Sequence, residues 1–142
     1  MSGWLLDTNI LAELRRPRPE PRVLSFIAEQ PLETLHISTV TLAEIRFGIE
    51  KLDDPVKRSS LTEWLTHRVR PMFDGRVLPV SEDVMLKWRL LMAEGRKIGH
   101  TFPQPDLIIA ATGLCHGLAI VTRDIDDYMR TGADLLNPWA LP

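Results

Sequence analysis

Five short apolar segments alternate with longer segments of helical spacing, and this alternation limits the fold more than any other feature of the chain. Strands separated by helices predict a parallel sheet with helices packed on both faces. We therefore expect an α/β fold with a central parallel sheet of about five strands. The expected strands are Trp4–Leu6, Leu35–Ser38, Arg76–Val80, Leu118–Thr122 and Asp134–Leu136. With 142 residues, of which 44% are hydrophobic, the chain is long enough for one domain over residues 1–142 with its own core.

The helical segments carry their own start and stop signals. Pro21 suits the first turn of a helix, and Ser81 suits the N-cap of another. The segment Asp106–His116 is apolar nearly all round and precedes Gly117, which favours the left-handed conformation at a helix end. This segment predicts a buried central helix, in which Cys115 is expected to be a small buried residue.

Four acidic residues follow, open or lie within the predicted strands and helices. Asp7 and Asp124 come directly after strand-like runs. Asp106 opens the apolar helix, and Glu44 lies on an amphipathic helix. In open parallel sheets, ligands bind outside the carboxyl ends of the strands. Four carboxylates gathered there would repel one another unless they were protonated or bound to a cation, so the pattern predicts a divalent metal site.

Each acid also has a purely structural interpretation. Asp7, Asp106 and Asp124 stand where an N-cap would accept hydrogen bonds from a first helical turn. Glu44 completes a capping box that begins at Thr41. The sequence leaves both interpretations open for any single acid, whereas the combination of all four favours a shared site.

The charge balance and the single cysteine exclude several classes of protein. A net charge of −2 and a pI of about 6.1 argue against a surface that binds nucleic acid over its whole area, so any polyanion binding is expected to be local. Cys115 has no second cysteine to pair with, which suits a reducing cytoplasm. Asp7 interrupts the first apolar run, so we expect no secretory signal, and no apolar run is long enough to span a bilayer. These features predict a cytoplasmic protein with no membrane association.

An open carboxylate cluster suits metal-assisted hydrolysis of a phosphodiester. That reaction needs a more acidic attacking water, neutralised phosphoryl oxygens and a stabilised leaving oxygen, and Mg²⁺ can supply all three. Mg²⁺ prefers a few carboxylates together with waters, and Mn²⁺ accepts the same oxygen ligands. Zinc is not expected, because the four histidines are not closely paired and the cysteine is alone. No Gly-x-Ser-x-Gly motif and no Gly-rich phosphate loop occurs in the sequence.

Four segments, in a particular order and spacing, carry a family resemblance that covers essentially the whole chain. They are Leu5–Glu13, Ser38–Gly48, Pro105–Thr112 and Val121–Asp124, and the ending Leu136–Trp139 agrees with them. The chain resembles PIN-domain ribonucleases, and more narrowly the VapC toxins of type II toxin–antitoxin systems and their FitB-like relatives. The resemblance implies a PIN-like fold and a metal-dependent endoribonuclease that acts as the toxin of a VapBC-type pair.

The same resemblance implies which residues form the site. Asp7, Glu44, Asp106 and Asp124 correspond to the catalytic acids, with Asp7 and Asp106 as the direct Mg²⁺ ligands. Asp127 is close enough in the sequence to contribute in place of Asp124.

Local basic side chains are the expected means of binding RNA. Arg15 and Arg16 follow the first helix, Arg123 adjoins the fourth acid, and Arg96 and His100 precede the third. Arginine pairs well with phosphate, although these residues equally suit solvated loops and helix ends. Single-stranded or loop RNA is the expected target, because splayed strands admit a scissile phosphate more easily than a stiff duplex.

Partners follow from the resemblance rather than from the residues. VapC-like proteins pair as homodimers and are silenced by a small cognate antitoxin of the VapB kind, which often binds DNA. The chain offers one hint, a set of apolar residues that either belongs to the core or exceeds what one small domain needs. The set is Ile45, Ile49, Leu61, Trp64 and Leu65.

Two other function classes remain open. A phosphomonoesterase of the haloacid dehalogenase type also begins with an apolar strand that ends in aspartate, but it needs a second aspartate two positions later, where this chain has Asn9. The other class is a PIN-fold protein without catalytic activity that serves as a partner in a DNA-bound regulatory complex. The presence of all four acids disfavours that interpretation.

Overall fold

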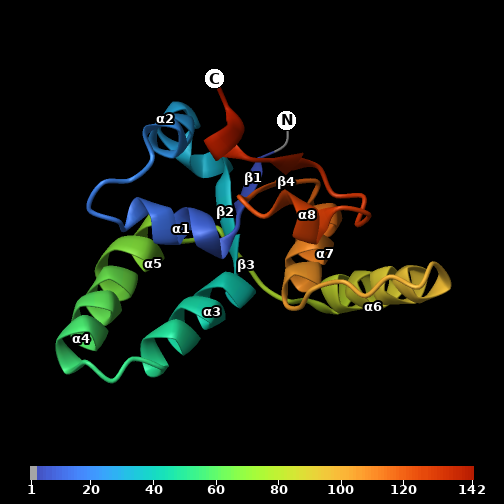
Figure 1. Ribbon diagram of the computed structural model, residues 1–142, viewed down its shortest axis with the longest axis horizontal. Helices are drawn as coiled ribbons and strands as arrows, with labels where there is room; N and C mark the ends of the chain where they lie inside the picture. Colours follow the sequence, from blue (N-terminus) through green and yellow to red (C-terminus); the bar gives the residue numbers. More distant parts are fainter. Residues whose placement is uncertain (1–2) are drawn as a thin grey trace.

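A five-stranded parallel sheet in the order β3-β2-β1-β4-β5 runs through the molecule, with helices on both sides (Figure 1). The computed structural model describes residues 3–142. The strands are β1 Trp4–Leu6, β2 Leu35–Ser38, β3 Val77–Leu78, β4 Ala119–Val121 and β5 Leu135–Leu136. The expected fold class is therefore confirmed.

Helices connect these strands in the alternating order that the sequence predicts. The α-helices are α1 Thr8–Leu14, α2 Pro21–Glu29, α3 Thr39–Glu50, α4 Pro55–Trp64, α5 Arg70–Met72, α6 Glu82–Lys97, α7 Asp106–His116 and α8 Ile125–Tyr128. Short 3₁₀ helices cover Leu32–Thr34 and Pro138–Ala140, and a π-helical turn over Leu65–Val69 joins α4 to α5. None of the helices described here has the length and apolarity that crossing a lipid bilayer demands.

Three of the five strands are shorter than expected, whereas β1 and β2 have the expected bounds. The expected strand over 76–80 contains only Val77 and Leu78, because Pro79 has no N–H with which to continue the ladder. The strands expected over 118–122 and 134–136 each lose residues at their ends. Their lost end residues still make single backbone hydrogen bonds, such as Thr122 N to Leu136 O at 3.0 Å.

The predicted helix signals at Pro21, Ser81 and Gly117 are confirmed. Pro21 opens α2, and the Ser81 hydroxyl accepts a hydrogen bond from Val84 N at 3.3 Å at the start of α6. Gly117 ends α7 with φ of 65°, a left-handed conformation that glycine adopts without steric cost.

The structural interpretation of the acids is wrong at three of the four positions. α3 begins at Thr39, three residues before the start that an N-cap at Thr41 would give, and is capped by Ser38, whose hydroxyl accepts from Val40 N at 3.0 Å, so Glu44 belongs to no capping box. Asp106 is the first residue of α7 rather than its N-cap, and the side chain of Asp124 makes no capping hydrogen bond to α8. Of the four predicted site acids, only Asp7 caps a helix, since its Oδ1 accepts a hydrogen bond from Thr8 N at 2.8 Å. Three carboxylates are thus left without a capping role.

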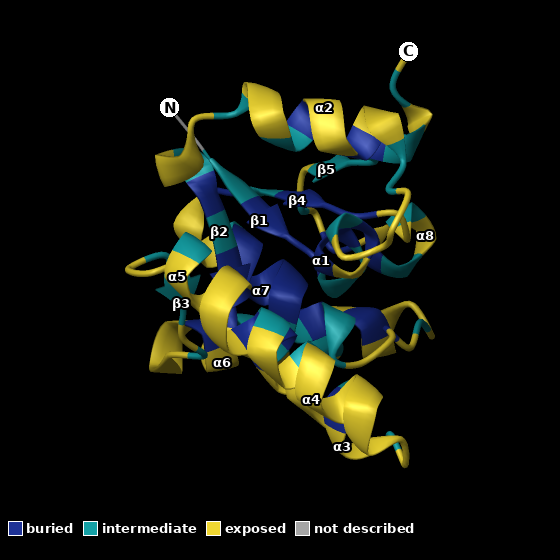
Figure 2. Cartoon of the chain, turned by 90° about the vertical axis from the view of Figure 1, so that its left-hand side faces the viewer, coloured by how far each residue is buried: buried dark blue, intermediate teal, exposed yellow. Residues whose placement is uncertain are grey.

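The core lies on both faces of the sheet because residues of β1 alternate in direction. Leu6 packs with Ile10 and Ile37 on the face covered by α1 and α3. Leu5 packs with Ile109 and Ile120 on the face covered by α7. Figure 2 shows the buried strands and α7 between helices whose outer faces are exposed. Each of these fully buried aliphatic side chains contributes about 1.5–3 kcal/mol to stability.

Cys115 is exposed, which contradicts its expected burial. α7 is buried from Leu107 to Gly113 except at the half-buried Ile108, but its last turn reaches the surface, so Cys115 and His116 both meet solvent. The thiol donates a weak hydrogen bond to the carbonyl oxygen of Asp83 on α6 at 3.6 Å, and burial raises its pKa. The apolar character of the segment predicted the burial of the middle of α7 correctly, but the predicted burial of Cys115 in its last turn is wrong.

Candidate active site

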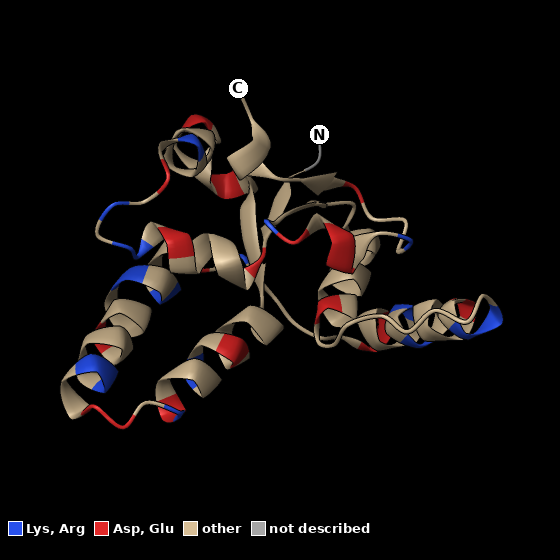
Figure 3. Ribbon diagram, viewed as in Figure 1, with Lys and Arg blue, Asp and Glu red and all other residues tan. Residues whose placement is uncertain are grey.

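Four carboxylates predicted from the sequence line one cavity of about 290 Å³. Asp7 follows β1, Glu44 projects from α3, Asp106 opens α7 and Asp124 follows β4. Figure 3 shows acidic segments of α3, α7 and α8 around the end of β1. Among the described residues, no lysine or arginine lines this acidic cavity. The topology therefore gathers the acids as expected and leaves their charge without a neighbouring cation.

Asp7 is the most firmly held of these acids. The residue is only 5% exposed, and both carboxylate oxygens accept hydrogen bonds. Oδ1 accepts from Thr8 N at 2.8 Å, whereas Oδ2 accepts from the hydroxyls of Thr122 at 2.8 Å and Tyr128 at 3.0 Å. Burial raises the pKa of Asp7, and the hydrogen bonds from Thr122, Thr8 and Tyr128 oppose that rise. The carboxylate is consequently fixed in one orientation at the end of β1.

Asn9 links the ends of β1 and β4. Its Nδ2 lies 3.2 Å from Thr122 Oγ1 and 3.2 Å from Asp124 Oδ2. Its Oδ1 accepts a hydrogen bond from Arg123 N at 3.2 Å. The side chain thereby holds Asp124 close to Asp7 across the strand ends.

The surroundings of Asp106 strongly perturb its carboxyl group. Burial raises the pKa of Asp106 to about 7, with further contributions from the negative charges of Asp7, Asp127 and Asp124. Asp124 lines the acidic cavity itself, while Asp127 lines an adjoining cavity together with Asp124. Both candidates for the fourth acid therefore lie beside the site.

Comparison with known proteins identifies the family of the chain. The family model of the PIN domain matches residues 4–133. The chain belongs to the PIN domain family. This PIN domain is 37% identical over 135 residues to the VapC ribonuclease Y4jK of Sinorhizobium fredii, covering 95% of this chain and 96% of that one. It is 34% identical over 135 residues to the toxin FitB of Neisseria gonorrhoeae, covering 95% of this chain and 97% of FitB.

The backbone of this PIN domain is also similar to a solved structure. A structure of FitAB bound to the IR36 DNA fragment contains a chain with a TM-score of 0.89 and 32% identity, and the similarity covers 98% of this chain and 97% of that one. The resemblance to PIN-domain, VapC and FitB proteins that the sequence motifs indicated is confirmed.

The acidic cavity of this PIN domain fits a divalent cation that takes oxygen ligands. Within residues 3–142, no three histidine, cysteine, aspartate or glutamate side chains already enclose a metal position. Mg²⁺ does not require such a cage, because it usually keeps several waters and binds through one or two carboxylates. The lining supplies four carboxylates and no basic side chain, which is the oxygen-rich and negatively charged setting that such a cation needs.

The predicted RNA-binding arginines lie outside the acidic cavity. The guanidinium carbon of Arg15 lies 6.0 Å from the centre of the Trp64 ring. That of Arg123 lies 5.1 Å from the centre of the Trp139 ring. Each lines a cavity that shares an acid with the acidic one, Glu44 in the case of Arg15 and Asp124 in the case of Arg123. Arg16 forms an ion pair with Glu13 at 3.3 Å and is less free to bind phosphate.

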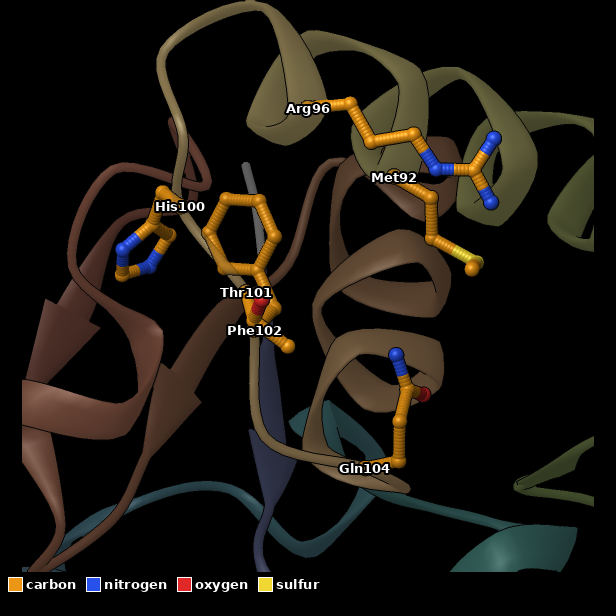
Figure 4. Close-up of a pocket in the computed structure, with 6 residues that line it drawn as sticks. All are labelled: Met92, Arg96, His100, Thr101, Phe102 and Gln104. Atoms are coloured by element: carbon orange, nitrogen blue, oxygen red, sulfur yellow. The ribbon is translucent and has the colours of Figure 1, made fainter.

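Arg96 and His100 belong to a different part of the surface. They line a cavity of about 270 Å³ between α6 and the loop that leads to α7, with Met92 and Phe102 in its wall (Figure 4). Figure 4 shows the Arg96 side chain extending away from His100. This cavity shares no lining residue with the acidic cavity, so the structure does not bring these two side chains to the acids.

An apolar groove adjoins the acidic cavity. Ile45, Leu61 and Trp64 line a cavity of about 250 Å³ between α1, α3 and α4. This cavity shares Thr8, Ala12 and Glu44 with the acidic cavity. Leu65, at 5% exposed, does not line it and belongs to the core. The expected apolar excess is thus partly surface and partly core.

Sequence reasoning missed Thr122 and Tyr128 as members of the site. Thr122 read as the end of a strand, and Tyr128 carried no motif. The available signal was their position, since both hydroxyls lie within four residues of Asp124.

Proposed function

We propose that this protein is a metal-dependent endoribonuclease and the toxin of a VapBC-type toxin–antitoxin pair. The observation that carries the proposal is the acidic cavity, where four carboxylates from four separate elements meet without a basic side chain in the lining. The similarity to a VapC ribonuclease and to the toxin FitB supports it.

The proposed cofactor is Mg²⁺, with Mn²⁺ as a substitute, held by Asp7 and Asp106. Such an ion acidifies the attacking water, neutralises phosphoryl oxygens and stabilises the leaving oxygen when it is bound. Asp7 contributes a carboxylate whose orientation is fixed by three elements. Glu44 is exposed at the rim on α3, where its carboxylate is free to accept a proton. Asp124 adds negative charge near Asp7 and is held by Asn9.

The proposed substrate is single-stranded or loop RNA. Arg15 and Arg123 flank the acidic cavity on two sides, in cavities that adjoin it. Their guanidinium groups suit the RNA phosphates on either side of the scissile phosphate. The carboxylates of the acidic cavity cannot bind a phosphate directly, because both groups are negatively charged, unless a cation lies between them. An unpaired strand can follow this path more easily than a stiff duplex.

The proposed partners are a VapB-like antitoxin and a second copy of the chain. The structure of FitAB bound to a DNA fragment contains a chain that is 32% identical to this one, and the similarity covers nearly the full length of both chains. The apolar groove lined by Ile45, Leu61 and Trp64 gives a partner segment an apolar surface directly beside the acids. A partner in that groove would also cover Glu44.

Cleavage of RNA by the purified protein tests the proposal. Mg²⁺ should support cleavage, excess EDTA should abolish it, and Asp7→Asn should reduce it by at least about 10³-fold, because a ligand charge is lost. Asp74→Asn, an exposed acid on another part of the chain, is the matched control. Cleavage that persists in EDTA, or near-normal cleavage by Asp7→Asn, would show that the nuclease assignment is wrong.

The same protein preparations separate the alternatives. Hydrolysis of p-nitrophenyl phosphate would support a phosphomonoesterase, and partner binding with no cleavage of any RNA would support a non-catalytic PIN domain. For the toxin assignment, expression of the chain alone should arrest growth, and co-expression of a small protein encoded nearby should relieve the arrest. Harmless expression of an active nuclease would contradict the toxin assignment alone.

A further inference from the structure

The hydroxyl group of Tyr128 has no packing role, although its ring does. The ring lies in the core cluster with Leu5, Ile109 and Ile120, and the residue is 1% exposed. A phenylalanine would fill that space equally well. A buried hydroxyl without a partner is destabilising, so its presence calls for one. The partner of the Tyr128 hydroxyl is Asp7, whose Oδ2 accepts a hydrogen bond from it with an oxygen–oxygen distance of 3.0 Å.

The two oxygens of Asp7 are used unequally. Oδ2 accepts from Tyr128 at 3.0 Å and from Thr122 at 2.8 Å, and Asn9 Nδ2 lies 3.4 Å away. Oδ1 accepts only the capping hydrogen bond from Thr8 N. A carboxylate oxygen has about two acceptor positions, so Oδ2 is saturated while Oδ1 keeps one free.

We propose that Tyr128 is a positioning residue for Asp7, and that its hydroxyl, together with Thr122, holds Oδ2 so that Oδ1 is the oxygen offered to a divalent cation. The inference rests on the proposed function, because it names how this chain prepares one of the two proposed ligands. Groups that hydrogen-bond to a metal ligand commonly set its orientation and its affinity for the metal.

Tyr128 is better suited to this role than Thr122. The Thr122 hydroxyl is shared, since it also accepts from Asp124 N at 3.0 Å and from Asn9 Nδ2 at 3.2 Å. Within residues 3–142, the Tyr128 hydroxyl makes a hydrogen bond to Asp7 and to no other residue. The backbone of Tyr128 is itself fixed, because the Thr131 hydroxyl donates to its carbonyl oxygen at 2.6 Å. The position of α8 is therefore transmitted to the carboxylate of Asp7.

Mn²⁺ binding to the folded protein, followed by electron paramagnetic resonance without substrate, tests the inference. Tyr128→Phe removes only the hydroxyl and should weaken Mn²⁺ binding about 10- to 100-fold relative to the unaltered protein. Thr112→Val is the control, because it removes a fully buried hydroxyl that donates to the carbonyl oxygen of Ile108 and does not touch Asp7 or Tyr128, and it should leave Mn²⁺ affinity unchanged. RNA cleavage by Tyr128→Phe should fall at low Mn²⁺ and recover at high Mn²⁺.

The outcomes distinguish this inference from the proposed function. If the unaltered protein and Tyr128→Phe bind Mn²⁺ equally well, Tyr128 is only structural, and the nuclease proposal stands. If the unaltered protein binds no Mn²⁺, both proposals are wrong. Nuclear magnetic resonance of the unaltered protein gives a second measurement: Mg²⁺ should shift the Thr8 amide, which reports on Oδ1, and the Tyr128 hydroxyl proton should be protected from exchange. A Tyr128 hydroxyl that exchanges freely with solvent would overturn the inference without any variant.

Discussion

The side-chain amide of Asn9 donates a hydrogen bond to Asp124 Oδ2 over 3.2 Å, although 115 residues separate the two in the chain. The position of Asn9 is the one at which a phosphomonoesterase of the haloacid dehalogenase type would need a second aspartate. Here the residue acts as a donor between acids, which an ionised aspartate cannot do.

Asn9→Asp should therefore destabilise the metal-free protein. At pH 8 the change should cost on the order of 1–3 kcal/mol, because a donor is lost and a charge is added beside Asp7 and Asp124. At pH 4 the loss of stability should be smaller, since the aspartate introduced at position 9 is partly protonated there. Urea unfolding at both pH values measures the effect. Asn9→Ala, which loses the donor without adding charge, should show no such dependence on pH.

Glu44→Gln should separate activity from stability. Glu44 is exposed on α3, so its neutralisation should change the free energy of unfolding by less than about 0.5 kcal/mol. RNA cleavage should fall at least about tenfold if Glu44 accepts a proton at the cavity rim. Glu50→Gln on the same helix should leave cleavage unchanged. Equal activity of the two variants would remove Glu44 from the proposed site.

The metal-free protein should lose stability as the pH rises through the range in which Asp106 titrates. The pKa of Asp106 is raised from 3.8 to about 7, so the folded state binds its proton more tightly than the unfolded state does. Stability from this group is complete below the unfolded pKa and is lost as the pH rises to about 7. The loss should be roughly 1–3 kcal/mol, which is below the full value for the shift because Asp106 is partly exposed.

Thermal unfolding between pH 4 and pH 8 in EDTA measures this loss. Asp106→Asn should flatten the pH dependence, whereas Asp74→Asn should not. Mg²⁺ at pH 8 should restore stability to the unaltered protein by binding the folded state. A stability curve that rises steadily from pH 4 to pH 8 would contradict the assigned perturbation.

Two helical glycines should respond to alanine in opposite directions. A Cβ at Gly48 on α3 would meet no atom within 4 Å, so Gly48→Ala should stabilise the protein by about 0.5–1 kcal/mol. A Cβ at Gly95 on α6 would lie 2.7 Å from the carbonyl oxygen of His100 and 2.9 Å from the Phe102 ring. Gly95→Ala should therefore destabilise the protein by about 1–3 kcal/mol. The melting temperatures of the two variants test this prediction, and shifts in the same direction would contradict it.

Cys115 should react with a thiol reagent in the folded protein. The residue is exposed at the end of α7, so modification by Ellman's reagent should need no unfolding. The reaction at pH 8 should be slower than that of free cysteine, because burial of part of the side chain raises the thiol pKa. Labelling that appears only in denaturant would mean that the last turn of α7 is covered.

The fold was largely predictable because its signals are local and periodic. The bounds of β1 and β2, the cap at Ser81 and the glycine end of α7 each depend on a few neighbouring residues. The errors arose where two local signals compete. Thr41 and Glu44 match a capping box, yet Ser38 lies at the strand end and starts α3 first.

The candidate site was predictable in part for a different reason. Strand ends place Asp7 and Asp124 at one edge of a parallel sheet, so their proximity follows from topology. The roles of Thr122 and Tyr128 depend on side-chain direction at a distance of more than 100 residues from Asp7, which no periodicity encodes. The separation of Arg96 and His100 from the acids likewise depends on how α6 packs against α7.

The central place of β1 has a consequence for synthesis of the protein. β1 pairs with β4, and the hydroxyls that hold Asp7 belong to Thr122 and Tyr128, so the site cannot form until residues 119–128 have been translated. Contacts between residues this far apart in the chain form late, because a long loop must close first. A nascent chain that stops short of β4 therefore holds Asp7, Glu44 and Asp106 but lacks Asp124 and the complete acidic cavity. An unfinished copy of the protein should be inactive, which confines any toxicity to chains that have left the ribosome with both halves of the site.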